Sequence, residues 1–150
     1  MFGDKKISEI MTPAPLDSCE SSSTIIDAAK IMKAKKRGCL IVFKDRKPVG
    51  ILTERDVVRR VVAENSDLTT TKVASVMSSP IISVMPDDTI SDVAKLLSDR
   101  GIRRAVVMKK DLILGLVTST DIVRTFVTEG GKDIQFFKAM LRSSAAWVNE

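Results

Sequence analysis

A seven-residue segment occurs twice in this chain in nearly the same form. It reads Gly-Ile-Leu-Thr-Glu-Arg-Asp at residues 50–56 and Gly-Leu-Val-Thr-Ser-Thr-Asp at residues 115–121. An ungapped shift of 65 residues also aligns Thr24 with Thr89 and Asp27 with Asp92. The chain is therefore a tandem duplication of a unit of about 60 residues, longer than a usual solenoid period and present only twice. Any fold for this chain has to accommodate two similar units.

Both repeats predict the same order of helices and strands from their apolar spacing. The elements expected in the first repeat are a helix at 24–36, strands at 39–43 and 49–52, and a helix at 54–62. Those expected in the second are a helix at 89–99, strands at 105–108 and 113–117, and a helix at 119–128. Thr24 with Asp27 forms a predicted capping pair. In a chain of 150 residues, two half-units with one shared core are favoured over two independent domains.

A short lead-in with a methionine and a proline precedes each repeat, at residues 10–13 and 76–80. The register of the two lead-ins differs by a residue or two, and a polar linker covers residues 65–71. We expect the first repeat with its lead-in at 1–65, the second at 66–130 and a helical tail at 131–150. The apolar residues of the tail have roughly helical spacing, which favours docking on its own subunit or on a dimer partner.

The composition excludes several classes of function. The chain has no histidine and no tyrosine, which removes histidine-dependent nucleophiles and leaves too few soft ligands for an ordinary zinc site. We expect no catalysis and no metal. Cys39 lies in an apolar run and is expected in the core, whereas Cys19 lies in a polar stretch and is expected to be a free thiol.

The source and location of the protein can also be predicted. Asparagine and glutamine are scarce while lysine, arginine, valine and isoleucine are abundant, which favours a thermophilic source. No apolar run is long enough to span a bilayer, and the amino terminus lacks the apolar core of a signal peptide. We expect a cytoplasmic protein without a membrane partner. The net charge of +5 suits a phosphate-bearing ligand without distinguishing nucleic acid from a nucleotide.

The repeated segment places a threonine where a strand becomes a helix and an aspartate three residues later. Helix capping alone explains Thr53 with Asp56, and Thr118 with Asp121. The same geometry suits a nucleotide, because N–H groups at a helix start bind phosphate and an aspartate accepts hydrogen bonds from ribose hydroxyls. The glycine that opens each segment would let such a ligand approach the backbone. Both interpretations remain open from the residues alone.

With the lead-ins, the order helix, strand, strand, helix and the Gly-apolar-apolar-Thr-x-x-Asp segment, all in tandem, the chain resembles a pair of cystathionine beta-synthase (CBS) domains over residues 5–128. The resemblance implies an α/β (α+β) fold of two β-α-β-β-α repeats, related by a pseudo-two-fold axis and forming one compact module. It also implies a homodimer and two clefts for AMP, ATP or S-adenosylmethionine. Such a nucleotide would be a regulatory ligand, and no cofactor is required.

By the same resemblance, each cleft combines the Thr and Asp of one repeat with the lead-in and the first hairpin strand of the other. One cleft is expected to use Thr53, Arg55 and Asp56 with Met77, Ser78, Pro80 and Arg103. The other is expected to use Thr118, Thr120 and Asp121 with Met11, Thr12, Arg37, Gly38 and Cys39. The family commonly has a basic residue facing the phosphate, which Arg103 matches and Gly38 does not. We therefore expect the cleft of Asp56 and Arg103 to bind a phosphorylated adenosine more tightly.

These features predict a non-enzymatic sensor that signals through a partner protein or through dimer shape, since no effector domain is expected on the chain. A structural dimerisation module with empty clefts is one alternative. Nucleic-acid binding is another, because Arg55, Arg59, Arg60 and Arg124 lie on or near the polar side of the last helix of each repeat. Aromatic residues make up only 4% of the chain and none alternates with these arginines, which favours a solvated face.

Overall fold

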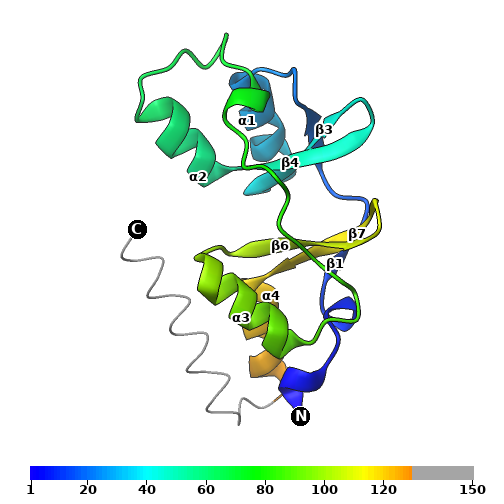
Figure 1. Cartoon of the computed structure of the whole chain (residues 1–150). Helices are drawn as coiled ribbons and strands as arrows, with labels where there is room; N and C mark the ends of the chain where they lie inside the picture. The colour runs from blue at the N-terminus through cyan, green and yellow to red at the C-terminus, as the bar shows by residue number, and fades with distance from the viewer. Residues whose placement is uncertain (130–150) are drawn as a thin grey trace. The chain divides into compact units, whose positions relative to one another are not determined.

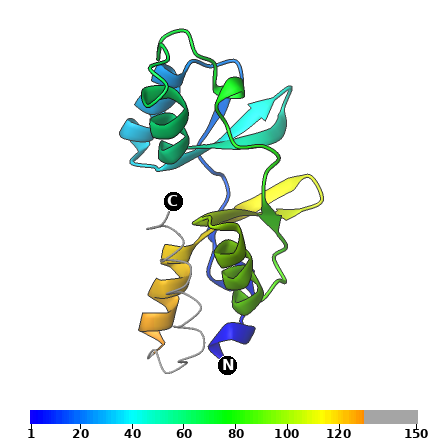
Figure 2. The same cartoon turned by 60° about the vertical axis from the view of Figure 1, so that its left-hand side comes forward.

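The computed structural model describes residues 1–129, so the predicted tail at 131–150 lies outside the described residues. The chain divides into two compact units, each shown in Figures 1 and 2. We call Leu16–Ile82 the central unit, and Met1–Pro15 together with the chain from Ser83 onward the terminal unit. The unit boundaries differ from the repeat boundaries because each lead-in belongs to the unit that contains the other repeat's hairpin.

The central unit is a three-stranded sheet with helices. Its elements are β2 (Ser18–Glu20), α1 (Ile25–Lys35), β3 (Cys39–Lys44), β4 (Lys47–Thr53), α2 (Glu54–Val57), the π-helical turn η3 (Val58–Val62) and the 3-10 turn η4 (Val73–Ser75). The strand order is β2-β3-β4, with β2 parallel and β4 antiparallel to β3. The expected helix at 54–62 is therefore one α-helical turn followed by a π turn.

The terminal unit repeats this plan and adds a strand. Its elements are the 3-10 turns η1 (Phe2–Asp4) and η2 (Ile7–Glu9), β1 (Thr12–Pro13), β5 (Ser83–Val84), α3 (Ile90–Arg100), β6 (Arg104–Lys109), β7 (Leu112–Thr118) and α4 (Ser119–Thr128). The strand order is β1-β7-β6-β5. In Figure 1, α3 and α4 lie side by side next to β6 and β7. Every helix and strand expected from the apolar pattern is present.

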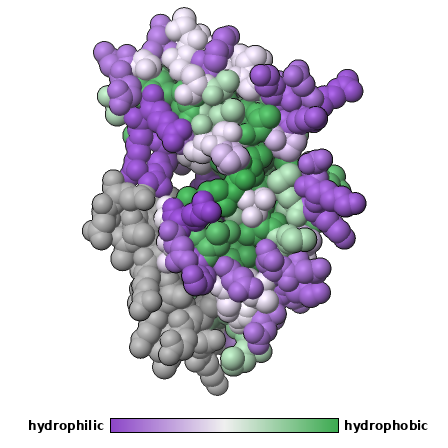
Figure 3. Space-filling view, viewed as in Figure 1, coloured by the Kyte–Doolittle hydropathy of each residue, from purple (hydrophilic) through white to green (hydrophobic). Residues whose placement is uncertain are grey.

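Each unit has its own hydrophobic core. Ile25, Leu40 and Leu52 are fully buried in the central unit. Ile90 and Val117 are fully buried in the terminal unit. The sequence favoured one shared core, whereas the described residues form two separate apolar clusters. The physical reason is that each two-layer arrangement of sheet and helices buries its own apolar face. Figure 3 shows hydrophilic side chains projecting outward from both units.

Candidate functional site

Both repeated segments end in a helix cap of the same geometry. Thr53 Oγ1 accepts a hydrogen bond from the Asp56 N–H at 3.1 Å, and Asp56 Oδ2 accepts one from the Thr53 N–H at 3.1 Å. In α4, Thr118 and Asp121 make the same two bonds at 3.1 and 2.9 Å. Thr24 caps α1 by accepting from the Asp27 N–H at 3.3 Å. The capping interpretation of the repeated segment is therefore confirmed.

The lead-in of each repeat docks beside the hairpin of the other. Ser78 pairs with Ile51 in the central unit, and Thr12 pairs with Leu116 in the terminal unit. Because Leu116 is the repeat equivalent of Ile51, Thr12 is the structural counterpart of Ser78. The offset between the lead-ins is 66 rather than 65 residues, which confirms the predicted change of register.

The glycine that opens each segment makes room for this lead-in. A Cβ on Gly50 would lie 2.7 Å from Met77 Sδ and 2.9 Å from the Ser78 carbonyl oxygen. A Cβ on Gly115 would collide with the Thr12 carbonyl oxygen and lie 2.8 Å from the sulfur of the methionine before it. We expected a ligand to approach these glycines, but the chain's own backbone occupies that space.

Asp56 has more hydrogen-bond partners than Asp121, the equivalent cap carboxylate of the second repeat. It is one of two polar residues among the buried ones in residues 1–129, with 6% of its surface exposed. Ser78 Oγ donates to its Oδ1 at 3.0 Å and is 3.2 Å from its Oδ2. Arg60 Nε lies 3.9 Å from Oδ1. The carboxylate therefore accepts bonds from its own cap and from the lead-in.

Arg60 also fixes the lead-in directly. Its Nη1 donates to the carbonyl oxygens of Val76 and Met77 at 2.9 and 3.2 Å. The sequence placed this arginine on a solvated face, and its side chain is 53% exposed, but its guanidinium group also holds the lead-in. Sequence reasoning missed the tether because the interaction joins residues 16 and 17 positions apart across a loop.

Asp121 has fewer partners than Asp56. Within residues 1–129 its carboxylate accepts from the Thr118 N–H, and Arg124 Nη1 lies 3.5 Å away, but no lead-in hydroxyl donates to it. Its side chain is 12% exposed, compared with 8% for Asp56. The Thr53–Asp56 cap and the Thr118–Asp121 cap therefore have the same backbone geometry but differ in their side-chain contacts.

The structure brings together part of each predicted site. Thr53, Arg55, Asp56, Met77, Ser78 and Pro80 all belong to the central unit, and Met11, Thr12, Thr118, Thr120 and Asp121 all belong to the terminal unit. The remaining predicted residues are in the opposite units, with Arg103 in the terminal unit and Arg37, Gly38 and Cys39 in the central one. Within its own unit, the Arg103 carbonyl accepts from the Ser119 N–H at 2.8 Å. The equivalent bond joins the Gly38 carbonyl to the Glu54 N–H at 3.0 Å.

The two cysteines are free, with burial opposite to the expectation. Cys19 is 7% exposed on β2, where it packs in the core as Val84 does on β5. Burial, together with the nearby negative charge of Glu20, raises the pKa of the Cys19 thiol from 9.0 to about 11. Cys39 is only partly buried. The strand β2 has only three residues, so the sequence does not show which of its side chains is buried.

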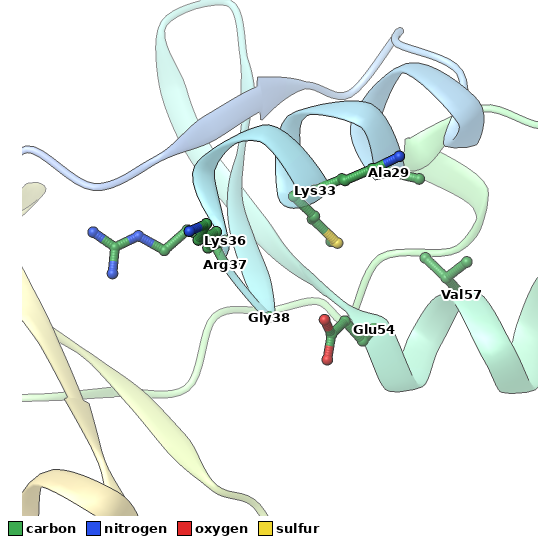
Figure 4. Close-up of a pocket in the computed structure, with 8 residues that line it drawn as sticks. Ala29, Lys33, Lys36, Arg37, Gly38, Glu54 and Val57 are labelled. Atoms are coloured by element: carbon green, nitrogen blue, oxygen red, sulfur yellow. The ribbon is translucent and has the colours of Figure 1, made fainter.

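A groove of about 630 Å³ lies between α1 and the start of α2 in the central unit, as Figure 4 shows. It is lined by Ala29, Met32, Lys33, Lys36, Arg37, Gly38, Glu54 and Val57. Sequence reasoning did not identify this groove, although the cationic run that ends α1 was a usable signal.

Within the described part of the chain, no helix is both long and apolar enough to cross a membrane.

Comparison with known proteins identifies the repeats. The family model described as CBS domain matches twice, at residues 7–63 and 73–128. The mitochondrial CBS domain-containing protein CBSX3 of Arabidopsis thaliana is 30% identical in an alignment of 129 residues, and the match covers 83% of this chain and 63% of the plant protein. The chain spans 57% of a second curated relative. It therefore matches only part of the length of these relatives.

Solved structures agree with the fold. A CBS domain protein of unknown function from Thermoplasma acidophilum has a TM-score of 0.80 at 28% identity, covering 94% of this chain and 76% of that one. A hexameric CBS-CP12 protein from bloom-forming cyanobacteria has a TM-score of 0.75 at 36% identity, covering 87% and 77%. The mixed arrangement of two strand-and-helix repeats is thus shared with solved CBS proteins.

Proposed function

The chain belongs to the CBS-domain family, and on this premise we propose that it is a regulatory module that binds an adenosine nucleotide at the cap carboxylates of its two repeats. CBS-domain pairs are typically regulatory and non-enzymatic. AMP, ATP and S-adenosylmethionine are the ligands we propose. The binding residues we propose are those named above for the two clefts.

The hydrogen bond from Ser78 Oγ to Asp56 carries this proposal. It shows a hydroxyl group donating to a carboxylate at 3.0 Å beside a helix start. The hydroxyls of a ribose would donate to the same carboxylate in the same way. Because the aspartate occupies the same cap position in α4, the proposal extends to Asp121.

We rank the Asp56 site above the Asp121 site. A ribose at Asp56 has to displace the hydrogen bond that the Ser78 hydroxyl donates to the carboxylate, which weakens binding there. The family resemblance assigns Arg103 to the phosphate of the nucleotide at Asp56, and a guanidinium group can make two parallel charge-assisted hydrogen bonds to a phosphate. Gly38 offers no equivalent group, so the arginine decides the ranking.

Calorimetry tests both the binding and the ranking. AMP, ATP and S-adenosylmethionine are titrated into the wild type and into Asp56→Asn and Asp121→Asn, because asparagine retains an oxygen that accepts the cap hydrogen bond. We expect a loss of affinity of about tenfold or more in Asp56→Asn and a smaller loss in Asp121→Asn. Asp27→Asn and Asp92→Asn are matched controls at the third position of α1 and α3, and neither should change affinity.

The outcomes separate the alternatives. A ligand that prefers the folded state raises the melting temperature, so no heat and no shift with any of the three compounds would favour a structural module. Equal losses in the two variants would contradict the ranking. A complex with nucleic acid should weaken steeply with salt, whereas a nucleotide in a pocket should respond less.

We also propose that the module acts as a homodimer and signals through a partner protein or through dimer shape. The hexameric assembly of the cyanobacterial relative supports self-association of this kind of module. Mass measurement in solution, with the chain intact and truncated at Gly130, tests whether the tail takes part. A cytoplasmic location and a thermophilic source remain part of this proposal.

A further inference from the structure

The Ser78 hydroxyl contacts both oxygens of the Asp56 carboxylate. Its Oγ lies 3.0 Å from Oδ1 and 3.2 Å from Oδ2, and Oδ2 also accepts the cap bond from the Thr53 N–H. A carboxylate has about four acceptor positions, and Asp56 is only 6% exposed. A ribose at this carboxylate would have to donate to the same two oxygens. The ribose and the Ser78 hydroxyl therefore compete for one acceptor group.

The terminal repeat has the same cap without such a competitor. Thr12 pairs with Leu116 as Ser78 pairs with Ile51. Within residues 1–129, however, the contacts of the Asp121 carboxylate come from its own helix and cap, and no hydroxyl of the lead-in donates to it. A hydroxyl on the carboxylate is thus not needed to dock a lead-in or to cap the helix in this fold. Folding of the repeat alone does not explain the bond from Ser78.

The central lead-in keeps other anchors when this bond is broken. Two backbone hydrogen bonds join Ser78 and Ile51, at 2.9 and 3.0 Å. Arg60 Nη1 holds the carbonyl oxygens of Val76 and Met77. The Ser78 hydroxyl can therefore leave Asp56 by rotation about a single side-chain bond, while the lead-in stays beside β4. Displacement of the hydroxyl weakens the docking of the lead-in without undoing it.

We propose that Ser78 is an intramolecular competitor of the nucleotide, an inference that rests on the function proposed above. In the free protein its hydroxyl occupies the Asp56 carboxylate, and a bound ribose replaces it and loosens residues 78–82. The chain passes from the central to the terminal unit between Ile82 and Ser83. The loosened segment thus leads to the second repeat. A ligand at Asp121 would have no such effect on its lead-in.

Calorimetry with AMP tests the competition. Binding and competition are reciprocal, because whatever holds Ser78 on Asp56 lowers the affinity of that carboxylate for a ribose. Ser78→Ala should therefore raise the affinity for AMP, by about three- to tenfold for the loss of one hydrogen bond to a charged group. The comparison is made in the Asp121→Asn background, so that the Asp56 site dominates the heat. A hydroxyl that instead contacts the bound nucleotide would make the variant bind AMP more weakly.

The neighbouring residue supplies a matched control. Ser79 lies in the same lead-in, and its Oγ donates to the Val49 carbonyl oxygen at 3.0 Å rather than to Asp56. Ser79→Ala is the same chemical change and also removes a bond that holds the lead-in, but it should leave the affinity for AMP unchanged. A second control is 2′,3′-dideoxyadenosine monophosphate. Because it lacks both ribose hydroxyls, its affinity should be equal in the wild type and in Ser78→Ala.

Hydrogen exchange measures the lead-in directly. In the wild type, AMP should speed amide exchange in residues 78–82 by about threefold or more, because the segment loses one of its anchors. Ser78→Ala should show the faster exchange without AMP, and AMP should add no further increase. The terminal lead-in at residues 11–14 should not exchange faster with AMP in either protein. The measurement on Ser78→Ala without AMP does not depend on nucleotide binding.

Several results would overturn the inference while leaving the proposed function intact. Unchanged or weaker AMP binding in Ser78→Ala would show that the hydroxyl does not compete. An equal gain in Ser79→Ala would assign the effect to general loosening of the lead-in. Slower exchange of residues 78–82 with AMP would contradict the loosening. Absence of AMP binding in the wild type and in every variant would instead overturn the proposed function, and this inference with it.

Discussion

The two lead-ins are held by different interactions, although they occupy equivalent places. In the central unit, side chains from Asp56 and Arg60 bond to the lead-in, and only one isolated bridge joins its backbone to β4. In the terminal unit, the lead-in forms the strand β1 and pairs with β7 at two positions. The position of Arg60 is Thr125 in that unit, where the hydroxyl bonds to the Asp121 carbonyl of its own helix.

This difference shows which parts of a duplicated unit are constrained. The glycine, the threonine and the aspartate are kept in both copies because backbone packing and helix capping require them. The side chains that fix the lead-in in the central unit are not repeated in the terminal unit, because there the pairing of β1 with β7 holds the lead-in in place. A ligand at Asp56 would compete with Ser78 and so act on the lead-in, whereas a ligand at Asp121 would meet no such bond.

The largest expected effect concerns the two glycines. Gly115→Ala should lower the free energy of unfolding by about 3 kcal/mol and Gly50→Ala by about 2 kcal/mol, because overpacking against a backbone oxygen cannot be relieved by a side-chain movement. The added Cβ meets the Thr12 oxygen more closely than the Ser78 oxygen. Urea unfolding of both variants measures the difference. A smaller loss for Gly115→Ala would contradict the view that backbone pairing fixes the terminal lead-in more rigidly.

A smaller effect is expected from the two aspartates. Asp56→Ala should cost about 2 kcal/mol and Asp121→Ala about 1 kcal/mol, since the first loses a cap and a bond from Ser78 while the second loses a cap. A double-mutant cycle with Ser78→Ala isolates the added bond in urea unfolding. Thr12→Ala in the same cycle with Asp121 is the control and should show no coupling. An equal loss of unfolding free energy in the two aspartate variants would contradict the difference between the two caps.

The smallest effect is a pH dependence from a buried thiol, which the central unit has and the terminal unit does not. The folded-state pKa of Cys19, about 11, lies above its ordinary value of 9.0. Stability from the buried thiol is therefore complete below pH 9 and is lost as the pH rises toward 11, by about 1 kcal/mol at pH 10. Cys19→Val copies Val84 of the other unit and should be less sensitive to this change. Parallel pH profiles of unfolding for the variant and the wild type would show that the thiol contributes nothing.

Much of the fold could be predicted because it depends on local patterns. The helices α1 and α3 begin after Thr24 and Thr89, which agrees with the apolar spacing of both segments and with the capping pair predicted at Thr24. The hairpins follow from two apolar runs around a charged turn. The strands β1, β2 and β5 were not found from periodicity, because segments of two or three residues are too short to show a period.

The candidate site was predictable only in part. Thr53 with Asp56 was identified because the cap is a local pattern of four residues. The tether from Arg60 to Val76 and the bond from Ser78 to Asp56 join distant residues, so they depend on how the lead-in packs. The burial of Cys19 likewise depends on its place in the sheet.

The sequence by itself determined the duplication, the order of the elements and the two helix caps, because spacing and capping act over a few residues. Only the tertiary structure decided that each lead-in docks beside the other repeat's hairpin, that Asp56 is tied to Ser78 while Asp121 is not, and that a cationic groove opens beside α1. These features come from contacts between segments that are far apart in the chain. Such contacts depend on the packing of the folded units.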